Sequence, residues 1–444
     1  MSGKFVMAVG KKTSKRFLKI TLIFFLSAVI SCATSSNQLS PAEPSEESLS
    51  NENQSEDSSA AQIESNFSPF SEKENPSNNQ KKSSKNKALK NQNDERLRKK
   101  IGQLFVIRPE SIDSRITAKD LAQNPSRGTA DVSSKMAAFY KKYPAGGFCI
   151  FARNIRTPVQ LKIFTKQLHG LNPSKSPLLY IDEEGGVVAR LANSKGFNLP
   201  QYKNMKSIGD TNNTDKAFSA GKNIGSYLKQ YGFDIDFAPV ADVNTNPDNP
   251  IIGSRAFSSN PVLAGKMDVA FLKGLHSAGV LGCLKHWPGH GDTKTDTHVG
   301  YAETNKTWAQ LKNCEVIPFK AGIENNLQII MAAHISAPKI TGNYLPATLS
   351  KTLLTEKLRK ELGFKGVIIT DAMEMGAIAK NYSSGEAAVR AIKAGADIIL
   401  MPLNYVNAFE GVLAAVKSGE ISEQRIDESI MRIEKMRKSL TVLF

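Results

Sequence analysis

The chain has 444 residues, of which 40% are hydrophobic, so it is long and apolar enough to bury a core. Its formal net charge is +16 at pH 7. The first hundred residues contribute +5 of this (16 Lys and Arg against 11 Asp and Glu), which leaves +11 for the rest. No helix-turn-helix, zinc-finger or aromatic RNA-binding motif accompanies the charge, so we expect no nucleic-acid partner. A cationic domain that works at an anionic polymer or surface fits better.

Residues 1–31 have the pattern of a secretory signal peptide. A basic start without acids precedes the apolar run Ile20–Ile30, which is too short to span a bilayer core of about 30 Å. The run ends in Val29-Ile30-Ser31-Cys32, which resembles the lipobox of bacterial lipoproteins, where the cysteine is lipidated. We predict export and a lipid anchor at Cys32, on the periplasmic or cell-surface side of the membrane. An ordinary cysteine near a cleavage site is the alternative.

Residues 32–96 are rich in Ser, Asn, Glu, Gln and Lys and poor in apolar side chains. Such a segment cannot bury enough surface to offset the entropy lost on ordering, so we predict a disordered tether. We expect residues 97–444 to fold as one catalytic domain. Its cysteines, Cys149, Cys283 and Cys314, show no disulfide or zinc spacing and are expected to be buried as small hydrophobic residues.

The predicted domain alternates short apolar runs with amphipathic helical stretches, such as Pro261–Ala278 and Leu311–Asn325. Because the runs lack strict alternation, they resemble parallel strands that are covered on both faces. Eight repeats predict an α/β fold, a single (β/α)8 TIM-type barrel. The expected strands are Gln103–Ile107, Gly146–Phe151, Leu178–Asp182, Ile235–Val240, Gly282–His286, Ile329–His334, Val367–Asp371 and Asp397–Met401.

Polar residues gather where these runs end. Asp182-Glu183-Glu184, residues 236–242, Lys285-His286, His334 and Asp371 all lie at such ends. Active sites of (β/α)8 barrels are built at the C-terminal ends of the strands, so we expect the chemistry there.

Residues 285–298 form the densest cluster, with three of the six histidines of the chain. Glycine and proline break any helix in this segment, so we predict a loop whose backbone can approach a ligand closely. A metal site is one interpretation, because His286, His290, Asp292, Asp296 and His298 are competent ligands. A loop of surface histidines is another.

These motifs together resemble glycoside hydrolase family 3, most closely its β-N-acetylglucosaminidase branch. The resemblance covers roughly residue 97 to the end of the chain, with several motifs in family order. The matching stretches are residues 181–191 (IDEEGGVVARL), 236–243 (DFAPVADV), 253–257 (GSRAF), 285–298 (KHWPGHGDTKTDTH) and 366–375 (GVIITDAMEM).

The resemblance implies roles for three catalytic residues. Asp371 matches the nucleophile that forms a covalent glycosyl-enzyme, and a carboxylate suits that role. His298, held by Asp296, matches the acid/base of this branch, in place of the second carboxylic acid used by most retaining enzymes. On the residues alone, Asp371 could instead cap the helix that follows its strand.

The resemblance also implies a sugar-binding set. Asp182 matches an acceptor of hydrogen bonds from sugar hydroxyls, and the matching donors are Arg190, Arg255, Lys285 and His286. Each could instead belong to a buried ion pair. Glu183 departs from the family, which often has Gln there, whereas His290 and Asp292 are expected to shape the loop.

The predicted activity is exo-hydrolysis of terminal β-linked N-acetylglucosamine with retention of configuration, on peptidoglycan fragments or amino-sugar oligosaccharides. We expect no cofactor and no metal, and a monomer. The alternatives are a β-glucosidase, a phosphate-using glycosidase on the same fold, and a glycan-binding lipoprotein without turnover.

Overall fold

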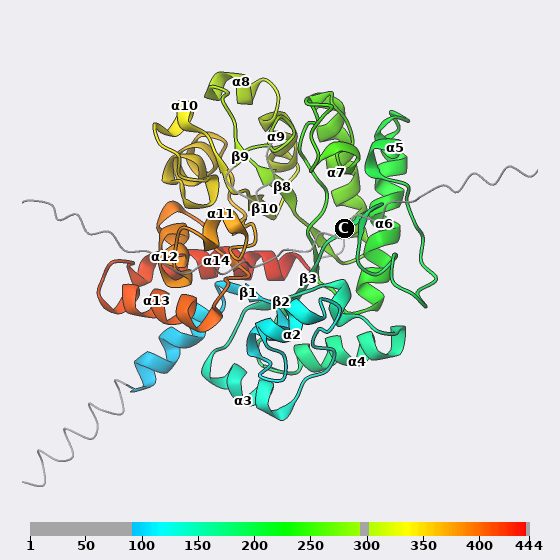
Figure 1. Ribbon diagram of the computed structural model, residues 1–444. Helices are drawn as coiled ribbons and strands as arrows, with labels where there is room; N and C mark the ends of the chain where they lie inside the picture. The colour runs from blue at the N-terminus through cyan, green and yellow to red at the C-terminus, as the bar shows by residue number, and fades with distance from the viewer. Residues whose placement is uncertain (1–90, 294–301, 441–444) are drawn as a thin grey trace, which may run out of the picture. The chain divides into compact units, whose positions relative to one another are not determined.

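The computed structural model describes residues 91–293 and 302–440 (Figure 1), so Cys32, the predicted signal peptide and most of the predicted tether lie outside the described residues. In the described part, no helix is long and apolar enough to cross a membrane. A helix covers residues 91–102, so residues 91–96, which we expected in the tether, are ordered. This helix is held against the rest of the domain because Leu97 is buried and Lys100 pairs with Asp427.

Parallel strands form the centre of the fold, as the sequence predicts. Seven of the eight expected runs contain one strand, and the run Gly282–His286 overlaps both β7 and β8. A six-stranded sheet has the order β13-β1-β2-β3-β6-β7, and a three-stranded sheet has the order β12-β10-β8. These strands are β1 (Phe105–Ile107), β2 (Gly147–Ile150), β3 (Leu178–Ile181), β6 (Ile235–Asp236), β7 (Leu281–Gly282), β8 (Leu284–Trp287), β10 (Ile329–Ala332), β12 (Val367–Thr370) and β13 (Ile399–Leu400).

The two sheets adjoin at both edges. A parallel bridge between Ile369 and Ile398 brings β12 beside β13, and β8 follows β7 directly along the same stretch of chain. The inner side chains come from alternate residues of these strands and contact one another in one cluster. Val106, for example, lies in this inner cluster, whereas Phe105 and Ile107 pack outward against the helices. Both faces of the strands are therefore covered, which explains their continuous apolar runs.

Helices surround the strands (Figure 1) and connect them in chain order. The longer ones are α3 (Ser134–Lys142), α4 (Pro158–His169), α6 (Thr214–Gln230), α7 (Pro261–Ser277), α9 (Val316–Glu324), η5 (Thr352–Glu361), α12 (Ser384–Ala394), α13 (Tyr405–Lys417) and α14 (Glu423–Ser439). The short ones are α2 (Ala118–Gln123), α5 (Met205–Gly209), α8 (Trp308–Lys312), α10 (Pro338–Thr341) and α11 (Gly376–Ala379).

Local sequence explains where these helices begin. Asn260 accepts hydrogen bonds from the backbone N–H groups of Val262 and Leu263, and Pro261 occupies the first helical position of α7. Thr157 and Pro158 repeat this arrangement in α4. Among the cysteines, Cys149 and Cys283 are buried as expected, whereas Cys314 is partly exposed.

Minor strands extend the C-terminal ends of the parallel strands. The hairpin β4 (Glu183–Gly185) and β5 (Val188–Ala189) follows β3, while β9 (Ala302–Glu303) pairs with β11 (Ile335–Ser336). These additions and the loops beside them carry the residues of the next section.

Candidate active site

The polar residues predicted at strand ends do lie together at the C-terminal end of the strands. Asp182 follows β3, Lys285 and His286 belong to the last part of β8, and Asp371 follows β12. Asp182 lies beside Lys285, and both Lys285 and His286 exert an attractive electrostatic effect on Asp371. Segments far apart in sequence therefore build one constellation.

Two carboxylates and two cations form its most buried part. The Lys285 ammonium lies 2.8 Å from Asp182 Oδ1 and 2.6 Å from Glu184 Oε1. Arg255 holds Glu184 with two bonds, from Nε at 2.8 Å and from Nη2 at 2.7 Å. We call Asp182, Glu184, Arg255 and Lys285 the sugar-end ion cluster. Of the two carboxylates, only Asp182 keeps appreciable exposure, with 19% of its side chain accessible against 1% for Glu184.

Opposite charges keep this cluster ionised despite its burial. Burial alone raises the pKa of Glu184, but Lys285 and Arg255 outweigh it and hold that pKa well below the usual range. Burial lowers the pKa of Lys285, yet Asp182 and Glu184 together raise it above its ordinary value. A fixed, hydrogen-bonded ammonium and an accessible carboxylate beside it suit a sugar that presents neighbouring hydroxyl groups.

Glu183 has a structural role rather than a place among the sugar-binding residues. Its carboxylate is fully buried and accepts hydrogen bonds from the backbone N–H groups of Leu191 and Ala192, each at 2.9 Å, and from the hydroxyl of Tyr227. It also accepts from the backbone N–H of Arg190. Glu183 thus fixes the backbone that carries Arg190.

Arg190 reaches back over the strand ends. Its Nη2 lies 3.6 Å from Asp182 Oδ2, and its guanidinium covers the ring of Phe151 at 5.5 Å from the centroid. The predicted binding residues Asp182, Arg190 and Lys285 are thereby brought into one group. Arg255 belongs to the same group through Glu184, with its bonds directed into the ion pair.

Asp371 is partly exposed at the end of β12, and its Oδ1 accepts a hydrogen bond of 2.7 Å from the backbone N–H of Ala372. Burial raises its pKa, but His334, His286, the backbone N–H of Ala372 and Lys285 together outweigh burial, so the pKa lies below its ordinary value. The alternative role as a helix cap is wrong, because α11 begins at Gly376 and its N-cap is Met375. Asp371 is therefore an ionised carboxylate at the mouth of the strands.

His286 and Asp242 form a tight pair next to this carboxylate. Asp242 Oδ2 lies 2.7 Å from His286 Nδ1, and its side chain has no exposed surface. The other oxygen, Oδ1, accepts the backbone N–H of His290 at 2.6 Å and that of His286 at 3.3 Å. One carboxylate thus holds both the ring and the backbone at the start of the histidine-rich loop.

The glycines of this loop serve packing within the protein. A Cβ at Gly291 would lie 1.8 Å from the carbonyl oxygen of Val243, and a Cβ at Gly289, with φ of 128°, would lie 2.6 Å from the Glu315 side chain. These contacts are within the protein, and the close approach of this backbone to a ligand stays a prediction. His290 and Asp292 shape the loop as expected, because His290 bonds Thr293 and Asp292 pairs with Lys306 at 3.3 Å.

The predicted acid/base pair, His298 and Asp296, lies outside the described residues. Lys306, which follows residues 294–301, forms ion pairs with Asp292, which precedes them, and with the buried Glu315 of the same side. These ion pairs hold the two flanking segments together. Within the two described ranges, no group of three or more His, Cys, Asp or Glu side chains is placed to hold a metal ion.

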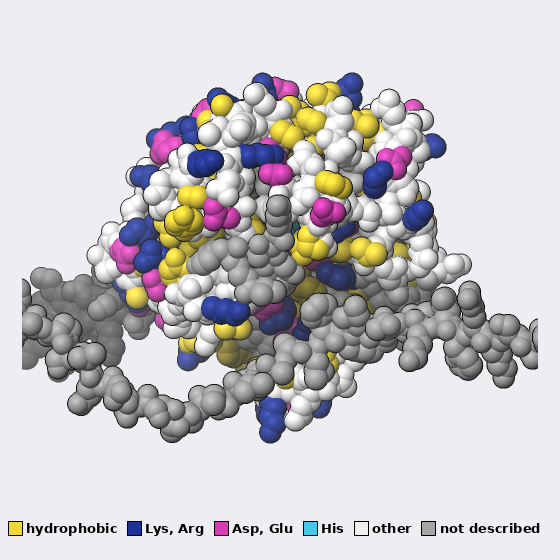
Figure 2. All heavy atoms as spheres, turned by 45° about the horizontal axis from the view of Figure 1, so that its top comes forward, with side chains coloured by type: hydrophobic (Ala, Val, Ile, Leu, Met, Phe, Trp, Pro, Cys, Tyr) yellow, Lys and Arg dark blue, Asp and Glu magenta, His cyan; other side chains and the backbone are white. Residues whose placement is uncertain are grey.

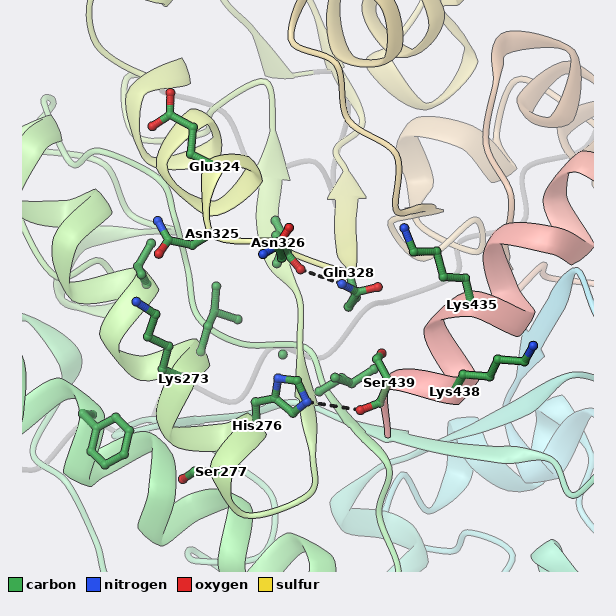
Figure 3. A pocket seen from close by; sticks show the side chains of 16 residues that line it. Lys273, His276, Ser277, Glu324, Asn325, Asn326, Gln328, Lys435, Lys438 and Ser439 are labelled. Carbon is green, nitrogen blue, oxygen red and sulfur yellow. Dashed lines mark hydrogen bonds between the residues drawn. The ribbon is translucent and has the colours of Figure 1, made fainter. Parts of the chain in front are cut away.

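A separate cavity of about 840 Å³ lies at the opposite, N-terminal end of the strands (Figure 3). Leu281 and Gln328, which line it, sit where β7 and β10 begin. Lys273, Lys435 and Lys438 surround it, and His276 bonds the carbonyl of Ser439. Because barrel chemistry is built at the other end, this cavity does not belong to the site.

On the surface face drawn in Figure 2, lysine and arginine are scattered among acidic and uncharged side chains. The face therefore presents mixed charge. Elsewhere in the described structure, exposed charges pair along helices, as Lys206 does with Asp210 and Arg390 with Glu386.

Sequence reasoning missed Asp242 as an individual site residue. It lies in the polar segment 236–242 that follows the fourth predicted strand, so its position carried the signal. Its partner could not be identified, because His286 is distant in the chain and only the fold brings the two together.

The family model described as "Glycosyl hydrolase family 3 N terminal domain" matches residues 96–436. Beta-hexosaminidase A of Pseudoalteromonas piscicida is 33% identical over 330 residues, which are 69% of this chain and 55% of that protein. Beta-hexosaminidase LpqI of Mycobacterium tuberculosis is 31% identical over 341 residues, 74% of this chain and 85% of that protein.

Among solved structures, a glycoside hydrolase family 3 β-N-acetylglucosaminidase from Paenibacillus sp. superposes with a TM-score of 0.70 at 32% identity. The alignment covers 78% of this chain and 62% of that one. The chain thus spans just over half of the Pseudoalteromonas protein and under two thirds of the Paenibacillus structure. The family match, which extends over most of the chain, shows that the chain belongs to glycosyl hydrolase family 3, a family of glycoside hydrolases.

Proposed function

We propose that the chain is a retaining exo-β-N-acetylglucosaminidase built on a closed (β/α)8 barrel. One observation carries the proposal: the ionised Asp371 carboxylate lies at the mouth of the strands, beside a fixed ammonium, a carboxylate and an imidazole that suit sugar hydroxyls. Relatives named β-hexosaminidase and a β-N-acetylglucosaminidase structure support the choice of amino sugar.

The reaction proceeds in two displacements. In the first, an oxygen of Asp371 attacks C1 of the sugar, the C1–O bond to the leaving group breaks, and protonated His298 gives its proton to the departing oxygen. In the second, neutral His298 takes a proton from water, whose oxygen attacks C1 and breaks the bond to Asp371. Two inversions return the β configuration.

The residues around Asp371 have distinct tasks in this scheme. Asp182, Arg190, Lys285 and His286 meet hydroxyl groups of the terminal sugar. Asp296 orients His298, which works near neutral pH because an imidazole titrates there. No cofactor takes part.

The proposed setting is the cell envelope. The lipobox-like end of the apolar run places lipidated Cys32 at the membrane, with the enzyme exported as a monomer on a tether. A terminal β-linked N-acetylhexosamine of peptidoglycan fragments or amino-sugar oligosaccharides is the proposed substrate.

Paired aryl glycosides test the activity. The purified chain should release the aryl group from the β-N-acetylglucosaminide much faster than from the β-glucoside, and unchanged by chelator. His298→Ala and Asp371→Asn should each lose activity, and added phosphate should yield no sugar phosphate. Release from the glucoside alone would contradict the substrate, chelator sensitivity would favour a metal, and sugar phosphate would favour phosphorolysis. A chain that binds sugar without turnover would contradict an enzyme altogether.

A further inference from the structure

Asp242 has contacts that a simple structural aspartate does not need. Its Oδ1 accepts two backbone N–H groups, those of His290 and His286, at 2.6 and 3.3 Å. Its Oδ2 is directed at the His286 ring, 2.7 Å from Nδ1. The side chain is fully buried, so no water competes for either oxygen.

This geometry decides which nitrogen of His286 carries a proton. An ionised carboxylate only accepts hydrogen bonds, so the Nδ1 that faces it must be the protonated one. In a neutral imidazole the other nitrogen, Nε2, then has a lone pair. His286 is thereby prepared to accept a hydrogen bond from a hydroxyl through Nε2, and donates from Nε2 only as imidazolium.

Other titratable groups lie near the Asp242–His286 pair, but none of them takes the place of Asp242 beside His286 Nδ1. His286 faces Asp371 from β12 and His290 from its own loop, with the two imidazole centroids 5.9 Å apart. Asp268, on α7, is fully buried near Asp242, and burial together with that neighbouring charge raises its pKa well above the usual value. Asp268 is therefore held in its neutral form.

We propose that Asp242 is a positioning residue that locks His286 as the Nδ1–H tautomer and aims Nε2 at the substrate beside Asp371. The inference rests on the proposed function for its effect on turnover, but the tautomer itself is a property of the free protein. Asp242 acts through His286 and touches no substrate.

Replacement by asparagine makes a specific prediction. Because the two backbone N–H groups require an acceptor at the Oδ1 position, the amide oxygen stays there and the NH₂ group replaces Oδ2. A donor then faces Nδ1, so the ring must present a lone pair at Nδ1 and carry its hydrogen on Nε2. Asp242→Asn should therefore invert the tautomer with little change of shape.

Nitrogen-15 NMR of histidine-labelled protein tests this directly. Spectra are recorded over a pH series, and the tautomer is read on the alkaline plateau of the His286 nitrogen shifts. The signals of His286 are assigned by their loss in His286→Gln. Wild type should show a protonated Nδ1 and an unprotonated Nε2, Asp242→Asn should show the reverse, and Asp248→Asn, an exposed position on the same loop, should match wild type.

Turnover supplies a second readout. Asp242→Asn should lower kcat/KM by about 100-fold, as expected for a misdirected group in an otherwise intact site. In the His286→Gln background the same change should cost little more, because Asp242 acts through that ring. Asp248→Asn should leave kcat/KM unchanged.

The outcomes separate the two claims. A wild-type His286 protonated at Nε2 overturns the positioning role, even if Asp242→Asn fails to fold. Fully additive losses in Asp242→Asn and His286→Gln also overturn it, since a purely structural aspartate acts independently of the ring. A protein with the predicted tautomers but without β-N-acetylglucosaminidase activity leaves the positioning role intact and contradicts the proposed function.

Discussion

Two buried ion clusters lie at opposite ends of the same strands. The sugar-end ion cluster joins two carboxylates to two cations, and its member Asp182 stays partly exposed. At the other end, Asp397, which precedes β13, is fully buried and meets Arg359, Arg425 and Arg432. Here three cations share one carboxylate, and burial lowers the pKa of Arg359 to about 10 despite that partner.

The difference lies in what satisfies the remaining donors. Arg425 gives hydrogen bonds to the carbonyls of Ile392 and Ala396, and Arg359 bonds those of Phe364 and Gly366, so this end is closed by the protein itself. At the sugar end, one exposed carboxylate leaves hydrogen-bonding capacity for a ligand. Similar ionic chemistry thus serves cohesion at one end and recognition at the other, as is general for barrels.

Removing the central cation of the sugar-end ion cluster should have the largest effect. Lys285→Met leaves Asp182 without its fixed partner and removes a donor to the sugar. We expect kcat/KM per folded molecule to fall by about 1,000-fold, roughly 4 kcal/mol of transition-state stabilisation. Steady-state kinetics with the aryl N-acetylglucosaminide measure it, and Lys266→Met, an exposed change on α7, is the control. A loss below tenfold contradicts the assignment.

The opposite cluster should respond in stability alone. Asp397→Asn removes the buried counter-charge that Arg359, Arg425 and Arg432 share, and we expect the free energy of unfolding to fall by about 3 kcal/mol. Urea denaturation followed by circular dichroism measures the change. Turnover per folded molecule should stay that of wild type, and a large fall in kcat would show that the two ends are not separate in function.

Acid should weaken the sugar-end ion cluster through Glu184. Because its pKa is lowered in the folded protein, its contribution to stability is complete above its ordinary pKa of 4.5 and is lost as the pH falls through the folded value. Below pH 4.5 the wild type should lose up to about 1.4 kcal/mol per pH unit through this carboxyl. Urea midpoints across this range should show a shallower slope for Glu184→Gln, and equal slopes would contradict the assignment.

We expect the smallest effect on stability at Asp268, with a pH dependence opposite in sign to that of Glu184. Both oxygens of Asp268 are buried and have no hydrogen-bond partner among the described residues. Its pKa is raised, so stability is lost as the pH rises above the ordinary value of 3.8. Asp268→Asn should therefore raise the free energy of unfolding by about 1 kcal/mol at pH 7. The gain should disappear in urea titrations below pH 3.8. Destabilisation at pH 7 would show that the carboxyl has a partner.

Much of the fold follows from local sequence. Seven of the eight apolar runs contain a strand, and Gly282–His286 overlaps β7 and β8. Helix α7 begins at the predicted Pro261 and ends at Ser277, one residue before the predicted end. The prediction of one helix over Leu311–Asn325 is wrong, because the structure has α8 and α9 there, with Cys314 between them. Helical periodicity continues across such a break, so the pattern does not reveal it.

The site was predictable in its location but not in its pairings. Strand ends identified Asp182, Lys285 and Asp371 from position, and the family motifs gave them roles. That Glu184 binds both Lys285 and Arg255, and that Asp242 holds His286, depends on side chains that are distant in sequence. No periodicity encodes such contacts, because they arise only when the strands are brought side by side.

The most direct test of the account is the covalent intermediate. Wild type mixed with the aryl β-N-acetylglucosaminide, quenched in acid during turnover and digested, should yield a peptide containing Asp371 that carries one N-acetylhexosamine. His298→Ala should retain more of this adduct when the leaving group is good, because its second step is slowed. An adduct on another residue, or a first product of inverted configuration, would contradict Asp371 as the nucleophile.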